Sequence, residues 1–105
     1  MVEIKPIGNS NFLSSLDLTK EEIHRIFDLA QSLKNKKLEL NYNNKVLGLI
    51  FDKASTRTRV SFQVAMANLG GITVDLNPNT SQIGRGEPIK DTARVLSRYC
   101  DVLAI

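Results

Sequence analysis

The sequence predicts an α/β domain in which a parallel sheet is built from βαβ crossovers. Residues 46–51 form a continuous apolar run, which is typical of a strand covered on both faces of a parallel sheet. Two further short apolar segments, at 72–76 and 102–105, alternate with helical patterns at 55–69 and 88–99. Such alternation favours parallel strands joined by right-handed crossovers. With one helix before the first strand, the expected order is α followed by βαβαβ.

A first helix is predicted over residues 20–37. The segment Thr19-Lys20-Glu21-Glu22 has the T-x-x-E pattern of a capping box, in which the threonine and glutamate side chains bond each other's backbone amides. Apolar residues then follow at helical spacing and predict a core-facing stripe: Ile23, Ile26, Phe27, Ala30 and Leu33. Lys34, Lys36 and Lys37 near the end complement the negative pole of the helix dipole, so we interpret them as a solvated helix terminus.

The second helix is predicted from Ser55 through Leu69, with both of its sides buried. It carries two apolar stripes: Val60, Val64 and Ala67 on one, and Phe62, Met66 and Leu69 on the other. Gly70-Gly71 supplies the left-handed backbone with which helices commonly end. Pro88 suits the first turn of a third helix, which is expected to run to about Tyr99.

Length and composition limit the possible functions. The 105 residues suffice for one small domain or part of one, and 14 basic against 11 acidic residues give a net charge of +3. This weak, scattered charge does not indicate nucleic-acid binding, but it suits small anionic substrates. No secretory signal or membrane-spanning apolar run is present, so a cytoplasmic location without membrane association is expected. With one cysteine, Cys100, and one histidine, His24, neither an internal disulfide nor a cysteine-histidine zinc site is expected.

The segment from Ser55 to Thr58 is the candidate anion-binding site. Ligands of open α/β sheets bind outside the carboxyl ends of the strands, where residues 52–59 and 77–87 are expected to lie. If Ser55 is the N-cap, the first-turn amides of Thr56, Arg57 and Thr58 have no helical partner and favour an anion such as phosphate. The three hydroxyl groups can add neutral donors, and Arg57 a planar pair of donors. The residues alone leave a second interpretation open, in which this is an ordinary N-cap beside a surface arginine.

Arg59 and two nucleotide-binding motifs were also considered as parts of an anion site, and none of them is supported. Arg59 lies about 200° of helix rotation from Arg57, so we expect it to be a structural ion-pair partner rather than a ligand. No G-x-x-x-x-G-K-[ST] motif occurs, and Gly84-Arg85-Gly86-Glu87-Pro88-Ile89 has isoleucine where a dinucleotide fingerprint needs its third glycine. ATP and NAD are therefore not indicated, and no cofactor is expected.

Two long motifs resemble the aspartate and ornithine carbamoyltransferases. Residues 51–59, F-D-K-A-S-T-R-T-R, are similar to that family's carbamoyl-phosphate signature, and residues 81–87 and 90–97 resemble its second loop and third helix. The resemblance implies that carbamoyl phosphate is bound by five residues: Ser55, Thr56, Arg57, Thr58 and Gln82. It also implies a catalytic role for Arg57 and a homotrimer in which the counterpart of Gln82 reaches a neighbouring subunit's site.

The resemblance also implies a reaction and a branch of the family. Gln82 and Arg85 stand where aspartate-specific members carry serine and lysine, so the expected amine is ornithine. The δ-amine of ornithine would take the carbamoyl group of carbamoyl phosphate, giving citrulline and phosphate in arginine metabolism, without metal or cofactor. Two alternatives stay open: a carbamoyltransferase for another amine such as putrescine, and a noncatalytic anion-binding module.

The chain is expected to be an amino-terminal fragment. The family's H-P-x-Q and H-C-L-P segments and its ornithine-binding domain do not occur in these residues, and the final segment 101–105 resembles a strand that has just begun. We therefore predict that residues 1–105 are an incomplete carbamoyl-phosphate-binding domain and are inactive alone.

Overall fold

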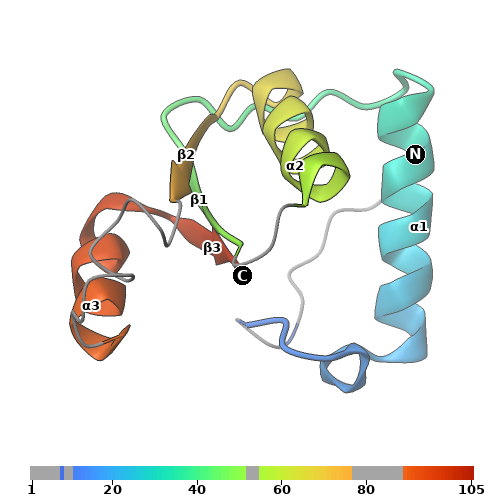
Figure 1. Cartoon of the computed structure of the whole chain (residues 1–105). Helices are drawn as coiled ribbons and strands as arrows, with labels where there is room; N and C mark the ends of the chain where they lie inside the picture. The colour runs from blue at the N-terminus through green and yellow to red at the C-terminus, as the bar shows by residue number, and fades with distance from the viewer. Residues whose placement is uncertain (1–7, 9–10, 52–54, 77–88) are drawn as a thin grey trace. The chain divides into compact units, whose positions relative to one another are not determined.

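A computed structural model describes residue 8 and residues 11–51, 55–76 and 89–105 of the chain. It divides into two compact units, Met1–Glu39 and Leu40–Ile105, which we describe separately. The first holds a short 3-10 helix, η1 (Ser15–Asp17), and helix α1 (Lys20–Lys34). The second has the order β1 (Val46–Ile50), α2 (Thr56–Asn68), β2 (Ile72–Leu76), α3 (Ile89–Tyr99) and β3 (Val102–Ala104) (Figure 1). The predicted order, a helix followed by βαβαβ, is confirmed.

Helix α1 begins with the predicted capping box. The Glu22 amide donates to Thr19 Oγ1 at 3.1 Å, and the Thr19 amide donates to Glu22 Oε1 at 2.9 Å. The second carboxylate oxygen of Glu22 accepts a hydrogen bond from the Gly8 amide at 3.0 Å. These bonds favour the charged carboxylate, so the Thr19 amide, followed by the Gly8 amide, lowers the pKa of Glu22 below its usual range.

Helix α1 ends at Lys34, three residues before the predicted end. Lys36 takes a left-handed conformation with φ of 58°, and its amide donates to Leu33 O at 3.1 Å. The Lys37 amide donates to Ser32 O at 2.9 Å, which completes a Schellman motif. Glycine usually marks this motif, so the lysine gave no signal. The predicted core-facing stripe was also wrong: none of its five residues is buried, and Ile26, Phe27 and Ala30 are exposed.

The three-stranded sheet has the order β2-β1-β3, and both strand pairs are parallel. Leu49 on the central strand is fully buried and Leu47 is 8% exposed, which confirms the strand that the apolar run predicted. Gly48 lies opposite Leu103 of β3 and Val74 of β2. The predicted α/β class with a parallel sheet is therefore confirmed.

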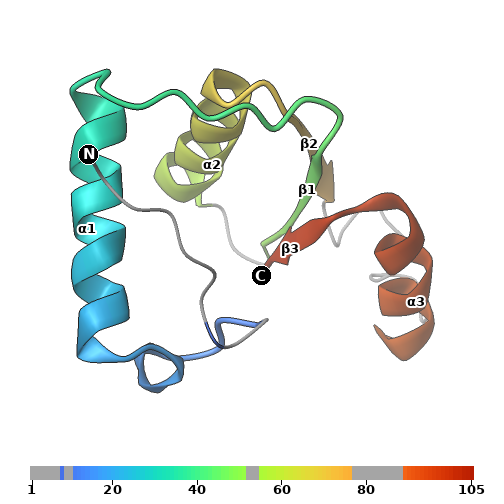
Figure 2. The same cartoon turned by 180° about the vertical axis from the view of Figure 1, so that it is seen from behind.

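Helices α2 and α3 lie on opposite sides of this sheet (Figures 1 and 2). The chain crosses from β1 to β2 in one direction and then returns past β1 to β3. When both crossovers are right-handed, this reversal places the two helices on opposite faces. It also creates a switch point between β1 and β3, and ligands of such folds bind beyond the carboxyl ends of the strands at switch points.

Helix α2 ends where the sequence predicted but is less covered than expected. Gly70 has φ of 85°, its amide donates to Ala67 O, and the Gly71 amide donates to Met66 O, each at 3.0 Å. The prediction that both sides of the helix are buried is wrong: no residue of α2 is buried, and Val64 is 53% exposed. Its most extensive contacts among the described elements are with β2. Pro88, the predicted start of the third helix, lies outside the described residues.

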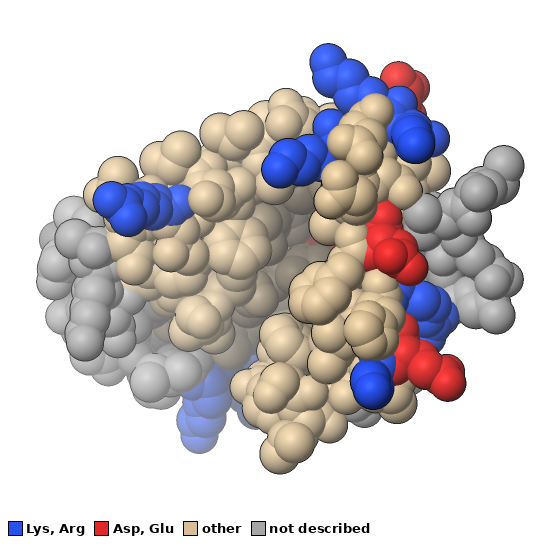
Figure 3. Space-filling model, turned by 90° about the vertical axis from the view of Figure 1, so that its right-hand side faces the viewer, with Lys and Arg blue, Asp and Glu red and all other residues tan. Residues whose placement is uncertain are grey.

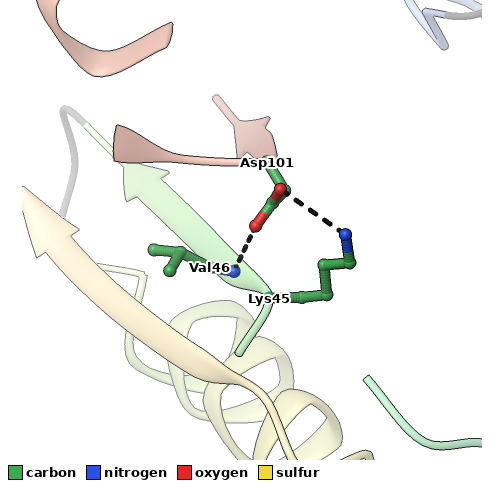
Figure 4. Close-up of polar contacts among 3 residues, drawn as sticks. All are labelled: Lys45, Val46 and Asp101. Carbon is green, nitrogen blue, oxygen red and sulfur yellow. Dashed lines mark hydrogen bonds and ion pairs between the residues drawn. The ribbon is translucent and has the colours of Figure 1, made fainter. Parts of the chain in front are cut away.

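Asp101 joins the amino ends of β1 and β3 (Figure 4). Its amide donates to Val46 O and its Oδ2 atom accepts from the Val46 amide, both at 2.8 Å. Its Oδ1 atom lies 3.9 Å from Lys45 Nζ. One aspartate thus fixes the start of the central strand against its neighbour by backbone and side chain together.

Charged side chains are distributed in small groups. In Figure 3, blue and red side chains of the described residues alternate down the right-hand side of the view, and much of the remaining described surface is tan. This agrees with the nearly balanced composition of 14 basic and 11 acidic residues. Among the described residues, the helices are too short or too polar to cross a membrane.

Candidate anion-binding site

The first turn of α2 follows the carboxyl end of the central strand. β1 ends at Ile50 and α2 begins at Thr56, after Ser55 as N-cap. The Arg59 amide donates to Ser55 O at 2.9 Å, and this is the first hydrogen bond of the helix backbone. The amides of Thr56, Arg57 and Thr58 therefore precede the first acceptor that α2 itself provides. Three backbone donors and the positive end of the helix dipole coincide at this point.

Ser55 is an N-cap by position, but its hydroxyl makes no capping hydrogen bond. In an ordinary N-cap, the serine oxygen accepts from an amide of the first turn and uses up one of the donors. Thr19 of α1 shows this arrangement in the same chain. Ser55 is half-buried, and its hydroxyl accepts no hydrogen bond from an amide of the first turn of α2. The Ser55 hydroxyl therefore leaves the first-turn amides of α2 without a side-chain cap.

Arg57 supplies a positive charge at this helix start. It is exposed, as are Thr56 and Thr58, and the first turn of α2 carries no acidic residue. A guanidinium can donate paired hydrogen bonds to phosphate oxygens. The structure thus brings four of the predicted residues together on one turn: Ser55, Thr56, Arg57 and Thr58.

Arg59 forms a structural ion pair, as the sequence predicted. Its Nε atom lies 2.9 Å from Oδ2 of Asp75 on β2, and the two side chains are 24% and 34% exposed. Its guanidinium carbon lies 5.7 Å from the centre of the Phe51 ring. Within the described residues, Nε makes no hydrogen bond of good geometry, so the contact with Asp75 is mainly one of charge.

One residue of the expected site lies outside the described residues, and one residue close to the start of α2 was not anticipated. Gln82, together with Arg85 in the same loop, lies outside the described residues, so its approach to the helix start stays a prediction. Asp75 was missed by the sequence analysis, although a single acidic residue within an apolar strand was a usable signal. Among the described residues, no group of three or more histidine, cysteine or acidic side chains could hold a metal ion.

Comparisons with known proteins identify the family. The carbamoyl-P binding domain of the Aspartate/ornithine carbamoyltransferase family matches residues 10–105. An ornithine carbamoyltransferase from Prochlorococcus marinus subsp. pastoris strain MED4 is 70% identical over 105 residues, which are 100% of this chain and 34% of that protein.

Solved structures agree with this assignment. The ornithine carbamoyltransferase of Pyrococcus furiosus has a TM-score of 0.82 at 45% identity, over 95% of this chain and 33% of the other. The aspartate transcarbamoylase of Trypanosoma cruzi, solved with carbamoyl aspartate and phosphate, has a TM-score of 0.82 at 30% identity, over 98% and 36%. The chain belongs to the aspartate/ornithine carbamoyltransferase family and matches its carbamoyl-phosphate-binding domain. It spans about a third of the length of the curated relatives, 34% for the Prochlorococcus protein.

Proposed function

We propose that this chain supplies part of the carbamoyl-phosphate site of an ornithine carbamoyltransferase. The observation that carries the proposal is the start of α2, where three first-turn amides and an N-cap hydroxyl that makes no capping bond follow the central strand. The whole protein would transfer the carbamoyl group of carbamoyl phosphate to the δ-amine of ornithine, giving citrulline and phosphate. Residues 1–105 would be the amino-terminal part of its first domain, and an ornithine-binding domain would complete it.

The proposed chemistry uses the helix start as a receptor for the leaving phosphate. The neutral amine attacks the carbamoyl carbon, a carbon–nitrogen bond forms, and the amine loses a proton, which the leaving phosphate accepts. The bond between the carbamoyl carbon and the bridging oxygen breaks, and phosphate leaves with the electron pair. The amides of the first turn, the hydroxyls of Ser55, Thr56 and Thr58, and the Arg57 guanidinium would stabilise the negative charge that develops on phosphate.

Relatives from Prochlorococcus marinus strains that are named ornithine carbamoyltransferase are 56–70% identical to this chain and support ornithine as the amine. The solved ornithine carbamoyltransferases from Gloeobacter violaceus and Pyrococcus furiosus are 52% and 45% identical to this chain. Two solved forms of the M. jannaschii aspartate transcarbamoylase are 38% and 39% identical, and the ornithine carbamoyltransferase of Burkholderia thailandensis is 36% identical, so the solved structures alone do not separate the two amines. The aspartate enzymes share the fold closely, so aspartate is the second candidate amine and should be tested beside ornithine and putrescine.

Further properties of the whole protein follow from the same proposal. We expect a homotrimer in the cytoplasm that serves arginine metabolism, with Gln82 contributing to the site of a neighbouring subunit. The family membership supports these expectations.

A chimeric enzyme tests the proposal directly. The present 105 residues would replace the aligned segment of the Prochlorococcus enzyme, which leaves the other two thirds of that protein unchanged. The chimera should form citrulline from ornithine and carbamoyl phosphate, and should use aspartate and putrescine poorly. Formation of carbamoyl aspartate instead would reassign the amine. A folded chimera that forms none of these products would overturn the proposed function.

Substitution of Arg57 tests the catalytic role. Arg57→Ala should lower kcat of the chimera by about 10²-fold or more, the scale for removing one preorganised donor from a developing charge. Arg57→Lys should recover little of this loss, because a point charge cannot reproduce the paired hydrogen bonds. Lys34→Ala on α1 is the control for removing one positive charge, and should leave kcat unchanged. Turnover near that of the parent in Arg57→Ala would remove this residue from the site.

A further inference from the structure

We infer that Arg59 and Asp75 form a positioning pair that holds the anion-binding start of α2 against the carboxyl end of β2. Arg59 lies in the first turn of α2, and its amide makes the first backbone hydrogen bond of the helix, to Ser55 O at 2.9 Å. Asp75 is the next-to-last residue of β2. Their side chains meet at 2.9 Å between Nε and Oδ2. The inference rests on the proposed function, because it assigns a role within that site.

Arg59 contacts residues at the carboxyl ends of two neighbouring strands, β1 and β2. Phe51 follows the last residue of β1, and its ring lies 5.7 Å from the Arg59 guanidinium carbon. The same ring lies 6.2 Å from the ring of Phe62, which is on α2. One arginine side chain therefore contacts groups that belong to the ends of β1 and β2. Any movement of the helix start relative to the sheet would disturb these contacts.

The environment of the pair makes it more than an ordinary surface ion pair. The two side chains are 24% and 34% exposed, whereas those of the pair between Lys45 and Asp101 are 57% and 44% exposed. Partial removal from water reduces screening by solvent and salt. The planar guanidinium can also face an aromatic ring, which a lysine ammonium does with a different geometry.

The expected effect is on anion affinity rather than on the chemical step. The amides of Thr56, Arg57 and Thr58 are fixed to the same helical turn, so a displaced helix start displaces all three donors together. Phosphate is bound by these donors both before and during the reaction. Loosening the short, rigid amide donors should weaken binding of substrate and transition state by similar amounts, which raises KM. The longer Arg57 side chain can follow the phosphate and keep its contribution to the chemical step, so kcat should stay nearly unchanged.

Two competing roles make different predictions. If Arg59 contacted the anion directly, removal of the Asp75 charge would leave the arginine present and binding intact. If the pair contributed only to stability, neither substitution would change KM in a folded protein. Asp75→Asn is therefore the deciding variant, since it keeps the size of the side chain and leaves Arg59 in place.

The experiment uses the chimera described above, with Arg59→Ala, Arg59→Lys, Asp75→Asn and the double variant Arg59→Ala/Asp75→Asn. We expect Arg59→Ala and Asp75→Asn each to raise KM for carbamoyl phosphate about tenfold, and kcat to change by about twofold or less. The inhibition constant of inorganic phosphate should rise in parallel. The double variant should resemble either single variant, because the two residues act through one contact. Arg59→Lys should recover part of the affinity.

Asp101→Asn is the matched control. It removes an aspartate of a second ion pair, at the amino end of the same central strand. It should lower the thermal unfolding temperature without changing KM. The inference fails if Asp75→Asn leaves KM unchanged in an active chimera, whatever Arg59→Ala does. A folded but inactive parent chimera would overturn the proposed function itself, so the two failures are distinguishable. If Arg59→Ala does not fold, Arg59→Lys and Asp75→Asn still decide the question.

Discussion

Gly48→Ala should destabilise the sheet, because the centre of β1 has no space for a methyl group. A Cβ atom at this position would lie 2.7 Å from Leu103 Cδ2 and 3.1 Å from Cys100 Sγ. Overpacking of this kind costs about 1–3 kcal/mol, while replacing glycine within a strand recovers about 0.5–1 kcal/mol. The Leu103 methyl can move, but the Cys100 sulfur lies close on the same side. We therefore expect a net loss of about 1 kcal/mol.

Urea unfolding of the 105-residue chain, followed by circular dichroism, measures this loss. A change of about 1 kcal/mol should lower the midpoint by about 0.5 M at the usual slopes for small proteins. Gly8→Ala is the control, since among the described residues no heavy atom lies within 4 Å of a Cβ atom there. Combining Gly48→Ala with Leu103→Ala should cost less than the sum of both, because the clashing atom is gone. An unchanged or raised midpoint for Gly48→Ala alone would refute the packing argument.

Three further outcomes are expected. Lys36→Gly should raise the unfolding free energy by about 0.5–1 kcal/mol, because glycine takes the left-handed conformation at the end of α1 without strain; a lower urea midpoint would contradict this. The depressed pKa of Glu22 means that its stabilisation is present at neutral pH and is lost as pH falls through its folded-state pKa, below the usual glutamate range. Helicity followed by circular dichroism should thus fall in acid, and Glu22→Gln should flatten that dependence; equal acid sensitivity in both chains would exclude the capping box as its cause. Mixing Gln82→Ala and Arg57→Ala chimeras should restore some activity in hybrid trimers, and inactive hybrids of proven mixed composition would argue against a shared site.

The sequence predicted the elements of the sheet well because their signals are local. The apolar run at 46–51 differs from the actual strand by one residue, and Gly70 and Gly71 end α2 as expected. The end of α1 was predicted three residues late. Lys36 takes the left-handed conformation that ends the helix, and a glycine usually marks such a position in a sequence. Burial of α2 was overestimated for another reason. Periodicity shows which residues share a face, but it does not show whether anything covers that face within the chain.

The site was predictable only in part. The sequence placed an N-cap at Ser55 and donors in the following turn, because capping follows from residue type and position. Whether the serine hydroxyl actually caps the helix depends on backbone angles that residue type does not determine. The pairing of Arg59 with Asp75 joins residues from different elements, and the parallel register of β1 and β2 decides which strand position lies near the helix start.

The central strand β1 has an ion pair that contains an aspartate near each of its ends, and the two pairs have different consequences. Asp101 holds its amino end through Val46 and Lys45, far along the strand from the start of α2. Asp75 acts at the carboxyl end, through an arginine of the same turn that carries the anion donors. Between these ends, Leu47 and Leu49 are buried and keep the strand in one position. Because these buried leucines hold the strand in the core, loss of the Asp101 contacts should loosen the amino end of β1 without moving the start of α2. Substitutions at the amino end should therefore affect stability, and substitutions at the carboxyl end should affect affinity for the anion.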